Sequence, residues 1–438
     1  MYLSMGGLQS KKTILRARLQ EKFLGAHKVL VFGLGTSGGG AGAARFLAEL
    51  GFSVRVTDQK NRRELTGSLR GLKELNISYA LGGHSKKDFD WADVVVKNPS
   101  IPNGSPWIKY AQKHRKIITS DADIFLALAP RERLLGVTGT KGKTTTTRLL
   151  AHVLGKSAIA VGTPGVSFFE AFGRKIQPRW IVAEFSSFDL ERVTESPHIA
   201  VVTSLFADHL NRYSNFRAYA NAKMNLVRFQ KNTDKAFVAN TVNAQKYVPQ
   251  KCTVVKTNVG TDERGVSYAS IGLARAVAAR LGVNSRIFTK RLKTFSLQPG
   301  SMEIVRKAGT RIFVNSTTAT NPGAAEYVLR ALAKRHGTMS VIAGGEDKKF
   351  PKSDIVRFAR ALKKYAKGSV VLLPGSFTER LAPHLGVGAL RARSMSDAVR
   401  KANAYGKPVV LAPAATSFNM FKNEFDRGEQ FSKAVRAL

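Results

Sequence analysis

A segment rich in glycine and threonine near residue 140 carries the residue types that bind nucleoside triphosphates. It reads Gly136-Val-Thr-Gly-Thr-Lys-Gly-Lys-Thr-Thr-Thr-Thr147, follows an apolar run and precedes a helical pattern. Backbone N–H groups of such a loop surround phosphate oxygens, while Lys143 would reach the terminal phosphate and the Thr144 hydroxyl would bind Mg²⁺. The spacing departs from G-x-x-x-x-G-K-[ST], because neither upstream glycine lies at the required distance from Gly142. We predict an ATP site here, against the alternative of a glycine–threonine turn without ligand.

Two further strand-like runs end in side chains that can bind magnesium. The apolar run from Trp180 ends at Glu184, and the run from Ala200 leads to Asp208 and His209. Ligands of open parallel sheets bind beyond the carboxyl ends of the strands, so we expect Glu184 and His209 to converge on the ATP loop as oxygen and nitrogen ligands. Taken singly, each residue favours an ordinary surface position at a strand end. Only their combination indicates a metal site.

A second glycine-rich turn lies near the N-terminus. An apolar run from Lys28 enters the turn Gly33-Leu-Gly-Thr-Ser-Gly-Gly39, and a helical pattern and a second strand ending at Asp58 follow. In Rossmann-like units an acidic residue about 20 positions after the glycines holds a ribose or base, and the helix N-terminus binds phosphate. Glycines that merely close a tight turn give the same pattern. The turn alone therefore leaves nucleotide binding open.

Strand and helix patterns alternate through the rest of the chain. Apolar runs near residues 311, 340, 369 and 408 each end in Gly, Pro, Ser, Thr or Asn and precede a helical pattern, which predicts a second doubly wound sheet with loops on one edge. We predict an α/β fold of three domains after a short extension. These are a basic N-terminal extension (1–25), a Rossmann-like domain (26–121), a central P-loop ATPase-type domain with a parallel or mixed sheet (122–298) and a C-terminal Rossmann-like α/β domain (299–438).

The composition is strongly basic. The 438 residues include 70 Lys and Arg against 30 Asp and Glu, a formal charge of +40. The basic residues are spread along the chain without a recognisable nucleic-acid-binding pattern, so we predict at most non-specific, charge-driven binding to nucleic acid. The single cysteine, Cys252, excludes a disulfide framework and fits a reducing compartment. We find no secretion signal and no apolar run of the roughly 18 residues that a membrane span needs, so we expect the protein to lie in the cytoplasm. We also expect it to be a monomer.

From Lys28 onward the chain resembles the Mur ligase family. The resemblance rests on the motifs GVTGTKGKTTTT, AEFSSFDLE, ADHLNRY, YANAK, STTATNPG, AGGEDK and APAATSFNMFKNEFDRGEQF, which begin at Gly136, Ala183, Ala207, Tyr219, Ser316, Ala343 and Ala412. The SSF triplet, the opening GLGTSGG and the ending FKNEFDRG favour the members that add D-glutamate. The resemblance implies an ATP-dependent, ADP-forming ligase that adds D-glutamate to UDP-N-acetylmuramoyl-L-alanine through an acyl phosphate, in the synthesis of peptidoglycan precursors.

The resemblance also implies roles for individual residues. The expected catalytic residues are Lys143, Glu184, His209 and Lys223. Magnesium would be held by Thr144, Glu184, His209 and Lys223, the last matching a lysine that family members carbamylate. ATP would be bound by Gly139, Thr140, Lys141, Gly142, Lys143, Thr144, Thr145 and Asn321. The UDP substrate would be bound by Thr36, Ser37, Asp58, Gln59 and Ser186. D-glutamate would be bound by Thr320, Lys348, Ser417 and Phe418.

The chain departs from the family pattern at nucleotide contacts. Ser267 and Tyr268 replace the His-Asn of the usual Gly-x-His-Asn, Ser301 replaces an arginine, and Ser316 and Thr318 replace an aspartate and a lysine. We expect Tyr268 to stack on the base in compensation. Two alternatives remain open: an amide ligase of the Mur or folylpolyglutamate type with another acid as substrate, and a non-catalytic paralogue that binds nucleotide or nucleic acid.

Overall fold

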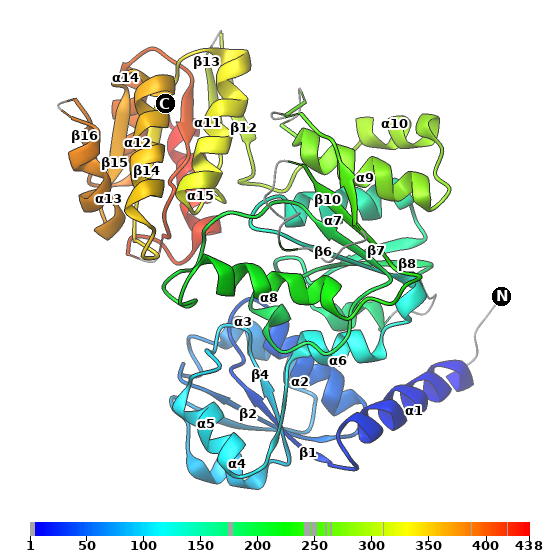
Figure 1. The fold of residues 1–438 in the computed structure, drawn as a ribbon. Coiled ribbons are helices and arrows are strands. Elements are labelled where there is room, and N and C mark those ends of the chain that lie inside the picture. The colour runs from blue at the N-terminus through cyan, green and yellow to red at the C-terminus, as the bar shows by residue number, and fades with distance from the viewer. Residues whose placement is uncertain are drawn as a thin grey trace.

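Three sheets, one after another along the chain, organise the computed structural model (Figure 1). The structure describes residues 5–173, 178–240, 247, 252–258, 261–262, 265–309, 311–386, 388–417 and 419–438, with side chains from Ser10 onward. In Figure 1 the N-terminal domain is blue and cyan, the central domain cyan to green, and the C-terminal domain yellow to red. The predicted three-domain α/β fold is confirmed. Among the described residues, no helix combines the length and apolar character that a membrane span requires.

The N-terminal sheet is parallel throughout, in the order β3-β2-β1-β4-β5. Its central strands are almost wholly buried because helices cover both faces. The strand order reverses between β1 and β4, and the crevice beyond such a reversal is where doubly wound sheets bind ligands. The strands are β1 Lys28–Phe32, β2 Ser53–Asp58, β3 Ile77–Leu81, β4 Val94–Lys97 and β5 Ile117–Thr119, and the helices are α2 Gly39–Glu49, α3 Thr66–Leu69, η1 Arg70–Leu72, α4 Lys86–Trp91 and α5 Pro106–Lys113.

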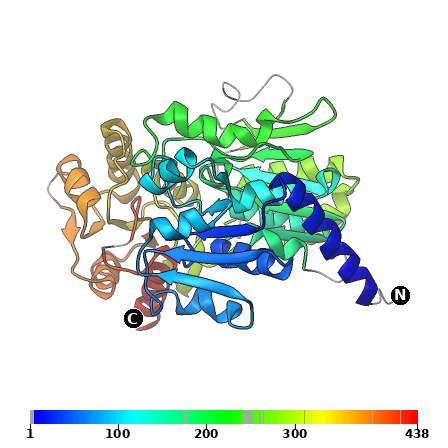
Figure 2. The same ribbon diagram turned by 90° about the horizontal axis from the view of Figure 1, so that it is seen from below.

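The predicted extension contains a helix, α1 (Met5–Lys22), that lies along the outside of the molecule (Figure 2). It packs against α6 (Asp121–Leu128), the first element after the N-terminal sheet. Arg18 donates to the carbonyl of Leu128 at 3.1 Å, and Lys22 pairs with Asp123 at 3.1 Å. The helix α1 therefore connects the N-terminal domain to the beginning of the central one.

The central sheet is also parallel, in the order β11-β10-β9-β6-β8-β7. Its middle strands are buried on both faces, as their uninterrupted apolar runs predict. The strands are β6 Leu134–Thr138, β7 Ala158–Val161, β8 Trp180–Glu184, β9 Ile199–Val202, β10 Lys235–Ala239 and β11 Cys252–Val255. The helices are η2 Arg131–Arg133, α7 Lys143–Leu154, η3 Phe168–Ala171, η4 Asp189–Glu191, α8 Phe216–Arg228, α9 Tyr268–Arg280 and α10 Ser285–Lys293.

The C-terminal sheet has the order β12-β13-β17-β14-β15-β16, with only β12 antiparallel to its neighbour. The sequence analysis missed its two edge strands, because neither is an apolar run. The strands are β12 Glu303–Ala308, β13 Arg311–Asn315, β14 Ser340–Gly344, β15 Val370–Leu373, β16 Leu390–Arg391 and β17 Val409–Leu411. The helices are α11 Pro322–His336, α12 Lys352–Ala366, α13 Ser376–Leu381, η6 Ala382–His384, α14 Met395–Ala404 and α15 Glu424–Arg436.

Candidate active site

A cavity of about 230 Å³ opens at the carboxyl ends of the central strands, where the C-terminal domain meets them. Three central strands, β6, β8 and β9, lead directly into its walls, as the parallel-sheet argument predicts. Loops of the C-terminal domain form the rest of the cavity wall. The lining includes Thr140–Thr145 after β6, Glu184 and Ser186 at β8, Asp208 and His209 after β9, Lys223 of α8, and Ser301, Thr318, Thr320 and Asn321.

The loop between β6 and α7 has the shape of a phosphate cradle. Gly139 and Gly142 adopt φ values of 148° and 83°. A Cβ atom on Gly139 would lie 2.1 Å from the Thr203 hydroxyl, so only glycine fits there. The backbone N–H groups of Thr140 and Lys141 donate to Ser204 at 2.8 and 2.7 Å, which fixes the loop before any ligand arrives. The helix α7 then begins without a side-chain cap, and its first residues, Lys143 to Thr145, line the cavity.

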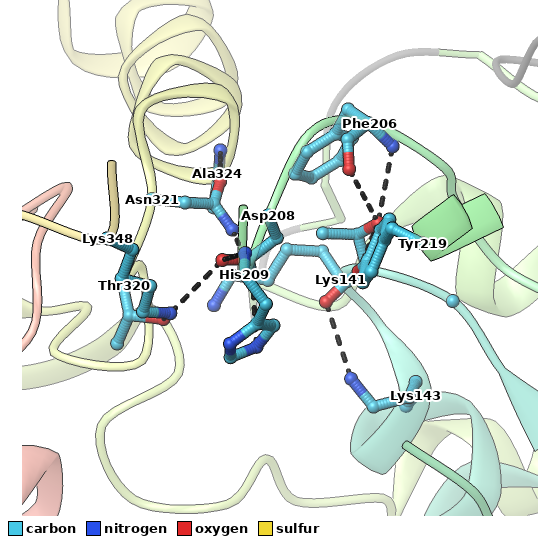
Figure 3. Close-up of polar contacts among 12 residues, drawn as sticks. Lys141, Lys143, Phe206, Asp208, His209, Tyr219, Thr320, Asn321, Ala324 and Lys348 are labelled. Atoms are coloured by element: carbon cyan, nitrogen blue, oxygen red, sulfur yellow. Dashed lines mark hydrogen bonds and ion pairs between the residues drawn. The ribbon is translucent and has the colours of Figure 1, made fainter. Parts of the chain in front are cut away.

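The side chain of Lys143 lies over this loop. It is the first residue of α7, and its Nζ donates to the carbonyl of Thr140 at 3.4 Å (Figure 3). The neighbouring Lys141 turns the other way and donates to the carbonyl of Thr318 in the C-terminal domain. Burial and the charge of Lys143 lower the pKa of Lys141 to about 7. Two lysines of one loop thus contact different domains.

Glu184 and His209 lie beside the loop and carry atoms that could bind a cation. The Oε2 atom of Glu184 is buried and has no hydrogen-bond partner, and burial raises the pKa of this carboxyl. Burial lowers the pKa of His209 to about 3, which leaves a neutral imidazole at pH 7, and its ring meets the edge of Phe188 at 4.7 Å. An unpaired buried oxygen and a neutral ring nitrogen are ligands for a divalent cation. Within the described ranges, no group of three or more His, Cys, Asp or Glu gathers to hold a metal.

Lys223 is buried against the phosphate loop. The helix α8 is capped by Asn215, whose Oδ1 accepts from the N–H of Ala218 at 2.9 Å, and it carries Tyr219 and Lys223 one turn apart on its buried face. Lys223 Nζ donates to the carbonyl of Gly139 at 2.8 Å and lies 4.8 Å from the Tyr219 ring centre. Burial and the charge of Lys143 hold the pKa of Lys223 well below its usual range. The side chain does not extend into solvent, and its burial favours the neutral amine.

Asp208 joins the central domain to the C-terminal domain (Figure 3). Its Oδ1 pairs with Lys348 Nζ at 3.1 Å, and its Oδ2 accepts from Asn321 Nδ2 at 2.8 Å. Lys348 also donates to the Thr320 hydroxyl at 3.3 Å. Burial alone would raise the pKa of Asp208, but the Lys348 ammonium and the hydrogen bonds from Asn321 and Lys348 together lower the pKa below the usual range. The sequence analysis assigned no role to Asp208, because its partners lie more than 110 residues away in the chain.

The predicted D-glutamate residues lie in two places. Thr320 and Lys348 meet at the cavity beside Asp208. Ser417 is buried in the loop after β17, where its carbonyl accepts from the N–H groups of Met420 and Phe421. The prediction for Phe418 lies outside the described residues.

The predicted UDP-binding residues lie away from this cavity, at the carboxyl end of the N-terminal sheet. Thr36, Ser37 and Gln59 are exposed around the turn after β1 and the end of β2. Asp58 is buried, and its two oxygens accept from the N–H groups of Gly35 and Lys60 at 2.9 and 2.8 Å. Its carboxylate therefore holds the glycine-rich turn in shape. Ser186 lines the cavity instead, which places the two ends of the predicted UDP-substrate site in different domains.

The residues that depart from the family pattern have structural partners. The Ser267 hydroxyl caps α9 by accepting from the N–H of Ala269 at 3.2 Å. Thr318 donates to the carbonyl of Gly300 at 3.0 Å, and the N–H of Ser316 donates to the carbonyl of Leu411 at 3.0 Å. Tyr268 is exposed at a separate cavity of about 770 Å³. Base stacking by Tyr268 stays a prediction.

Known proteins resemble this chain in sequence. The profile described as "Mur ligase MurD-like, N-terminal domain" matches residues 27–120, and "Mur ligase middle domain" matches residues 137–301. The chain is 33% identical to the UDP-N-acetylmuramoylalanine--D-glutamate ligase of Roseiflexus sp. (strain RS-1), over 95% of this chain and 99% of that one. It is 30% identical to the ligase of the same name from Geobacter metallireducens, over 94% and 97% of the two chains.

Solved structures show the same fold. The UDP-N-acetylmuramate-alanine ligase MurC of Thermotoga maritima matches with a TM-score of 0.60 at 19% identity, over 94% of this chain and 99% of that one. The MurF ligase of Thermotoga maritima, solved in complex with ADP, matches with a TM-score of 0.58 at 17% identity, over 88% and 95% of the two chains.

Proposed function

The chain belongs to the Mur ligase family, and on that premise we propose that it joins D-glutamate to UDP-N-acetylmuramoyl-L-alanine at the expense of ATP, in peptidoglycan precursor synthesis. One observation of the structure supports this most: the phosphate loop of the central domain and the cationic Lys348 of the C-terminal domain line or adjoin one cavity. A ligase that activates one acid and then adds an acidic amino acid needs both features side by side. The complete loop with Lys143 and the unpaired Glu184 oxygen argue against a non-catalytic paralogue.

The proposed reaction has two steps. An oxygen of the substrate carboxylate attacks the γ-phosphorus of ATP, the bond to the β-phosphate oxygen breaks, and ADP leaves. The amine of D-glutamate then attacks the acyl carbon, and the tetrahedral intermediate expels inorganic phosphate together with the original carboxylate oxygen. The amine loses a proton as the amide forms. Both steps gather negative charge, so catalysis consists mainly of placing cations and N–H groups around it.

The residues of the cavity perform this placement. The N–H groups at the start of α7 face the phosphates, and Lys143 lies where it can follow the charge of the transferred group. Lys348, held by Asp208 and Thr320, lies where it can bind a carboxylate of the amino acid. Because the loop is already fixed by Ser204, little rearrangement is needed when ATP binds.

We also propose that Glu184, His209 and the hydroxyl of Thr144 hold Mg²⁺. The unpaired buried oxygen of Glu184 and the neutral imidazole of His209 fit such an ion. Mg²⁺ commonly takes one or two protein carboxylates and completes its coordination with phosphate oxygens and water, so the small donor set is sufficient. The bound ion would neutralise phosphate charge. Glu184 and His209 would hold it from two neighbouring loops.

Lys223 is proposed to carry a carbamate. Burial favours the neutral form of its amine, which is the form that reacts with carbon dioxide, and the product would be a carboxylate beside the phosphate loop. Lys223→Ala is expected to lower the rate of phosphate release about 30-fold, as loss of a supporting carboxylate does at metal sites. Added short-chain carboxylates should restore part of the rate, because they can occupy the vacated space.

The matched control for this test is Lys231→Ala, which removes an exposed lysine just beyond α8. It should retain the full rate and show no response to carboxylates. An unrescued Lys223→Ala protein that still melts like the wild type would contradict the carbamate and leave Lys223 as a hydrogen-bond donor to Gly139.

The function itself is tested by an amino-acid panel. The protein is incubated with ATP, Mg²⁺ and UDP-N-acetylmuramoyl-L-alanine, and phosphate release is measured with D-glutamate, L-glutamate, L-alanine, a diamino acid or no amino acid. We expect sustained release with D-glutamate alone. Release with another amino acid would favour a different amide ligase, and no release in any mixture would favour the non-catalytic alternative.

A further inference from the structure

The segment from Asp208 to Tyr213 contacts both neighbouring domains. At one end, Asp208 bonds to Lys348 and Asn321 of the C-terminal domain. At the other end, Arg212 reaches the N-terminal domain, where its Nη1 donates to the carbonyl of Ser100 at 2.8 Å and its Nη2 to the carbonyl of Ile101 at 3.1 Å. His209 lies between these two ends of the segment.

The guanidinium of Arg212 is fixed on the central domain as well. Its Nε and Nη2 donate to the two oxygens of Glu191 at 3.1 and 2.8 Å, and its plane lies 4.3 Å from the ring centre of Phe188. Glu191 also accepts from the Tyr213 hydroxyl at 2.9 Å. Only 11% of the Arg212 side chain and 9% of the Glu191 side chain are exposed. The planar guanidinium of Arg212 binds one carboxylate through two nitrogens, donates to two carbonyls and stacks on an aromatic ring. A lysine cannot make this set of contacts.

The segment 98–101, which Arg212 contacts, also contacts the predicted UDP-binding turn. Asn98 Nδ2 donates to the carbonyl of Gly33 at 3.1 Å, and Asn98 Oδ1 accepts from the N–H and hydroxyl of Ser100 at 3.0 and 2.8 Å. A Cβ atom on Gly33 would lie 2.9 Å from both Asn98 and Ile101, so the two segments touch. Gly33 opens the turn that contains Thr36 and Ser37. Arg212 thus reaches the predicted UDP-binding turn through Ile101, and also through Ser100 and Asn98.

Arg212 also contributes to the packing around His209, the proposed metal ligand. The Phe188 ring that it covers meets the His209 ring at 4.7 Å. His209 has a φ of 54°, a backbone conformation that costs energy for a residue other than glycine and persists only where its surroundings hold it. Arg212 and Phe188 are part of those surroundings.

We infer that Arg212 is a positioning residue that sets the N-terminal UDP-binding turn at a fixed place relative to His209 and the phosphate loop. The UDP substrate is held at the turn and reacts at the cavity, so its carboxylate arrives in line with ATP only when the two domains are in register. Arg212 contacts neither reactant in this role. The inference rests on the proposed function, since it assigns one end of the substrate to each domain.

The test is the kinetics of Arg212→Gln with each of the three substrates. We expect kcat/KM for UDP-N-acetylmuramoyl-L-alanine to fall about 30-fold or more, because a buried charged partner of several groups is removed. The KM values for ATP and D-glutamate should change less than about twofold. Arg212→Lys keeps the charge but loses the fork, so it should recover only part of the loss.

Arg217→Gln provides the matched control, since it removes the same charge from an exposed position in the first turn of α8. It should behave as the wild type. Asn98→Ala tests the same connection from the other domain and keeps the central domain intact. It should reproduce the selective loss for the UDP substrate, and the double variant Arg212→Gln/Asn98→Ala should lose less than the product of the two single effects.

Three outcomes would overturn the inference. The Arg212→Gln protein could match Arg217→Gln, its KM values could rise equally for all three substrates, or the effects of the two substitutions could multiply fully in the double variant. If Arg212→Gln fails to fold, Arg212→Lys takes its place in the comparison with Arg217→Gln and in the double variant with Asn98→Ala. Failure of the proposed function is distinguishable, because the wild-type protein would then release no phosphate with D-glutamate. An active wild type with unselective variants would refute the positioning role alone.

Discussion

Replacing Lys143 with alanine is expected to lower ATP-dependent phosphate release by about 10³-fold, the size of effect seen when one preorganised charge-stabilising donor is removed. Lys143 begins α7, lines the cavity and lies over the phosphate loop. Phosphoryl transfer depends on cations that follow the shifting charge, and the loop N–H groups alone do not supply one. The measurement is phosphate release at saturating substrates, with ATP binding followed separately by calorimetry.

Lys156→Ala is the control for this variant. It removes an exposed lysine just beyond the C-terminus of the same helix and should leave the rate unchanged. A Lys143→Ala protein that releases phosphate within tenfold of the wild type would contradict the assignment of the loop. A variant that unfolds at a much lower temperature would be replaced by Lys143→Met, which keeps most of the side-chain volume.

Replacing Lys348 with glutamine is expected to raise the KM for D-glutamate about 100-fold, with the KM for ATP nearly unchanged. A hydrogen bond to a charged group contributes up to about 3 kcal/mol, and 1.4 kcal/mol corresponds to a factor of ten. Lys348 is buried behind Asp208 and Thr320, which line the cavity, so water screens its charge poorly. The measurement is the rate of phosphate release against D-glutamate concentration.

Two variants separate binding from stability in that experiment. Lys348→Arg retains a cation for Asp208 and should keep part of the affinity, whereas Lys348→Gln leaves Asp208 without its charged partner. Lys349→Gln removes the adjacent, exposed lysine and should have no effect on the KM. Equal KM values for the Lys348→Gln and Lys349→Gln proteins would exclude Lys348 from the amino-acid site.

Sequence patterns were sufficient for the features that depend on local order. The apolar runs of β1, β6, β8 and β9 predict buried parallel strands, and the residues at their carboxyl ends meet because parallel strands end on the same edge. The convergence of Glu184 and His209 on the phosphate loop follows from this alone. The edge strands β12 and β16 carry few buried residues and therefore give no apolar pattern.

Contacts between distant segments could not be predicted from one sequence. Asp208 and Lys348 are 140 residues apart, and Arg212 is 112 residues from Ser100. Lys348 is named only through the family resemblance, which does not supply its pairing with Asp208, and Arg212 does not stand out among the 70 Lys and Arg residues. Asp58 lies at the end of β2, as predicted. Its contacts were not predictable, because its two oxygens accept from backbone N–H groups at the turn.

The high positive charge has a partial explanation at the site. Lys143 and Lys348 lie at or beside one cavity, and ATP, the UDP substrate and D-glutamate are all anions. A positive field at this place attracts all three reactants. Nothing in the structure explains the remainder of the +40.

The most direct test of ligation through an acyl phosphate is the fate of the carboxylate oxygens. UDP-N-acetylmuramoyl-L-alanine labelled with ¹⁸O in both carboxylate positions is incubated with the protein, ATP, Mg²⁺ and D-glutamate. The ¹⁸O content of each product is then measured by mass spectrometry. We predict one ¹⁸O in each inorganic phosphate and one in each new amide, in equal amounts. Unlabelled phosphate, or phosphate released without an amide bond to D-glutamate, would contradict the account.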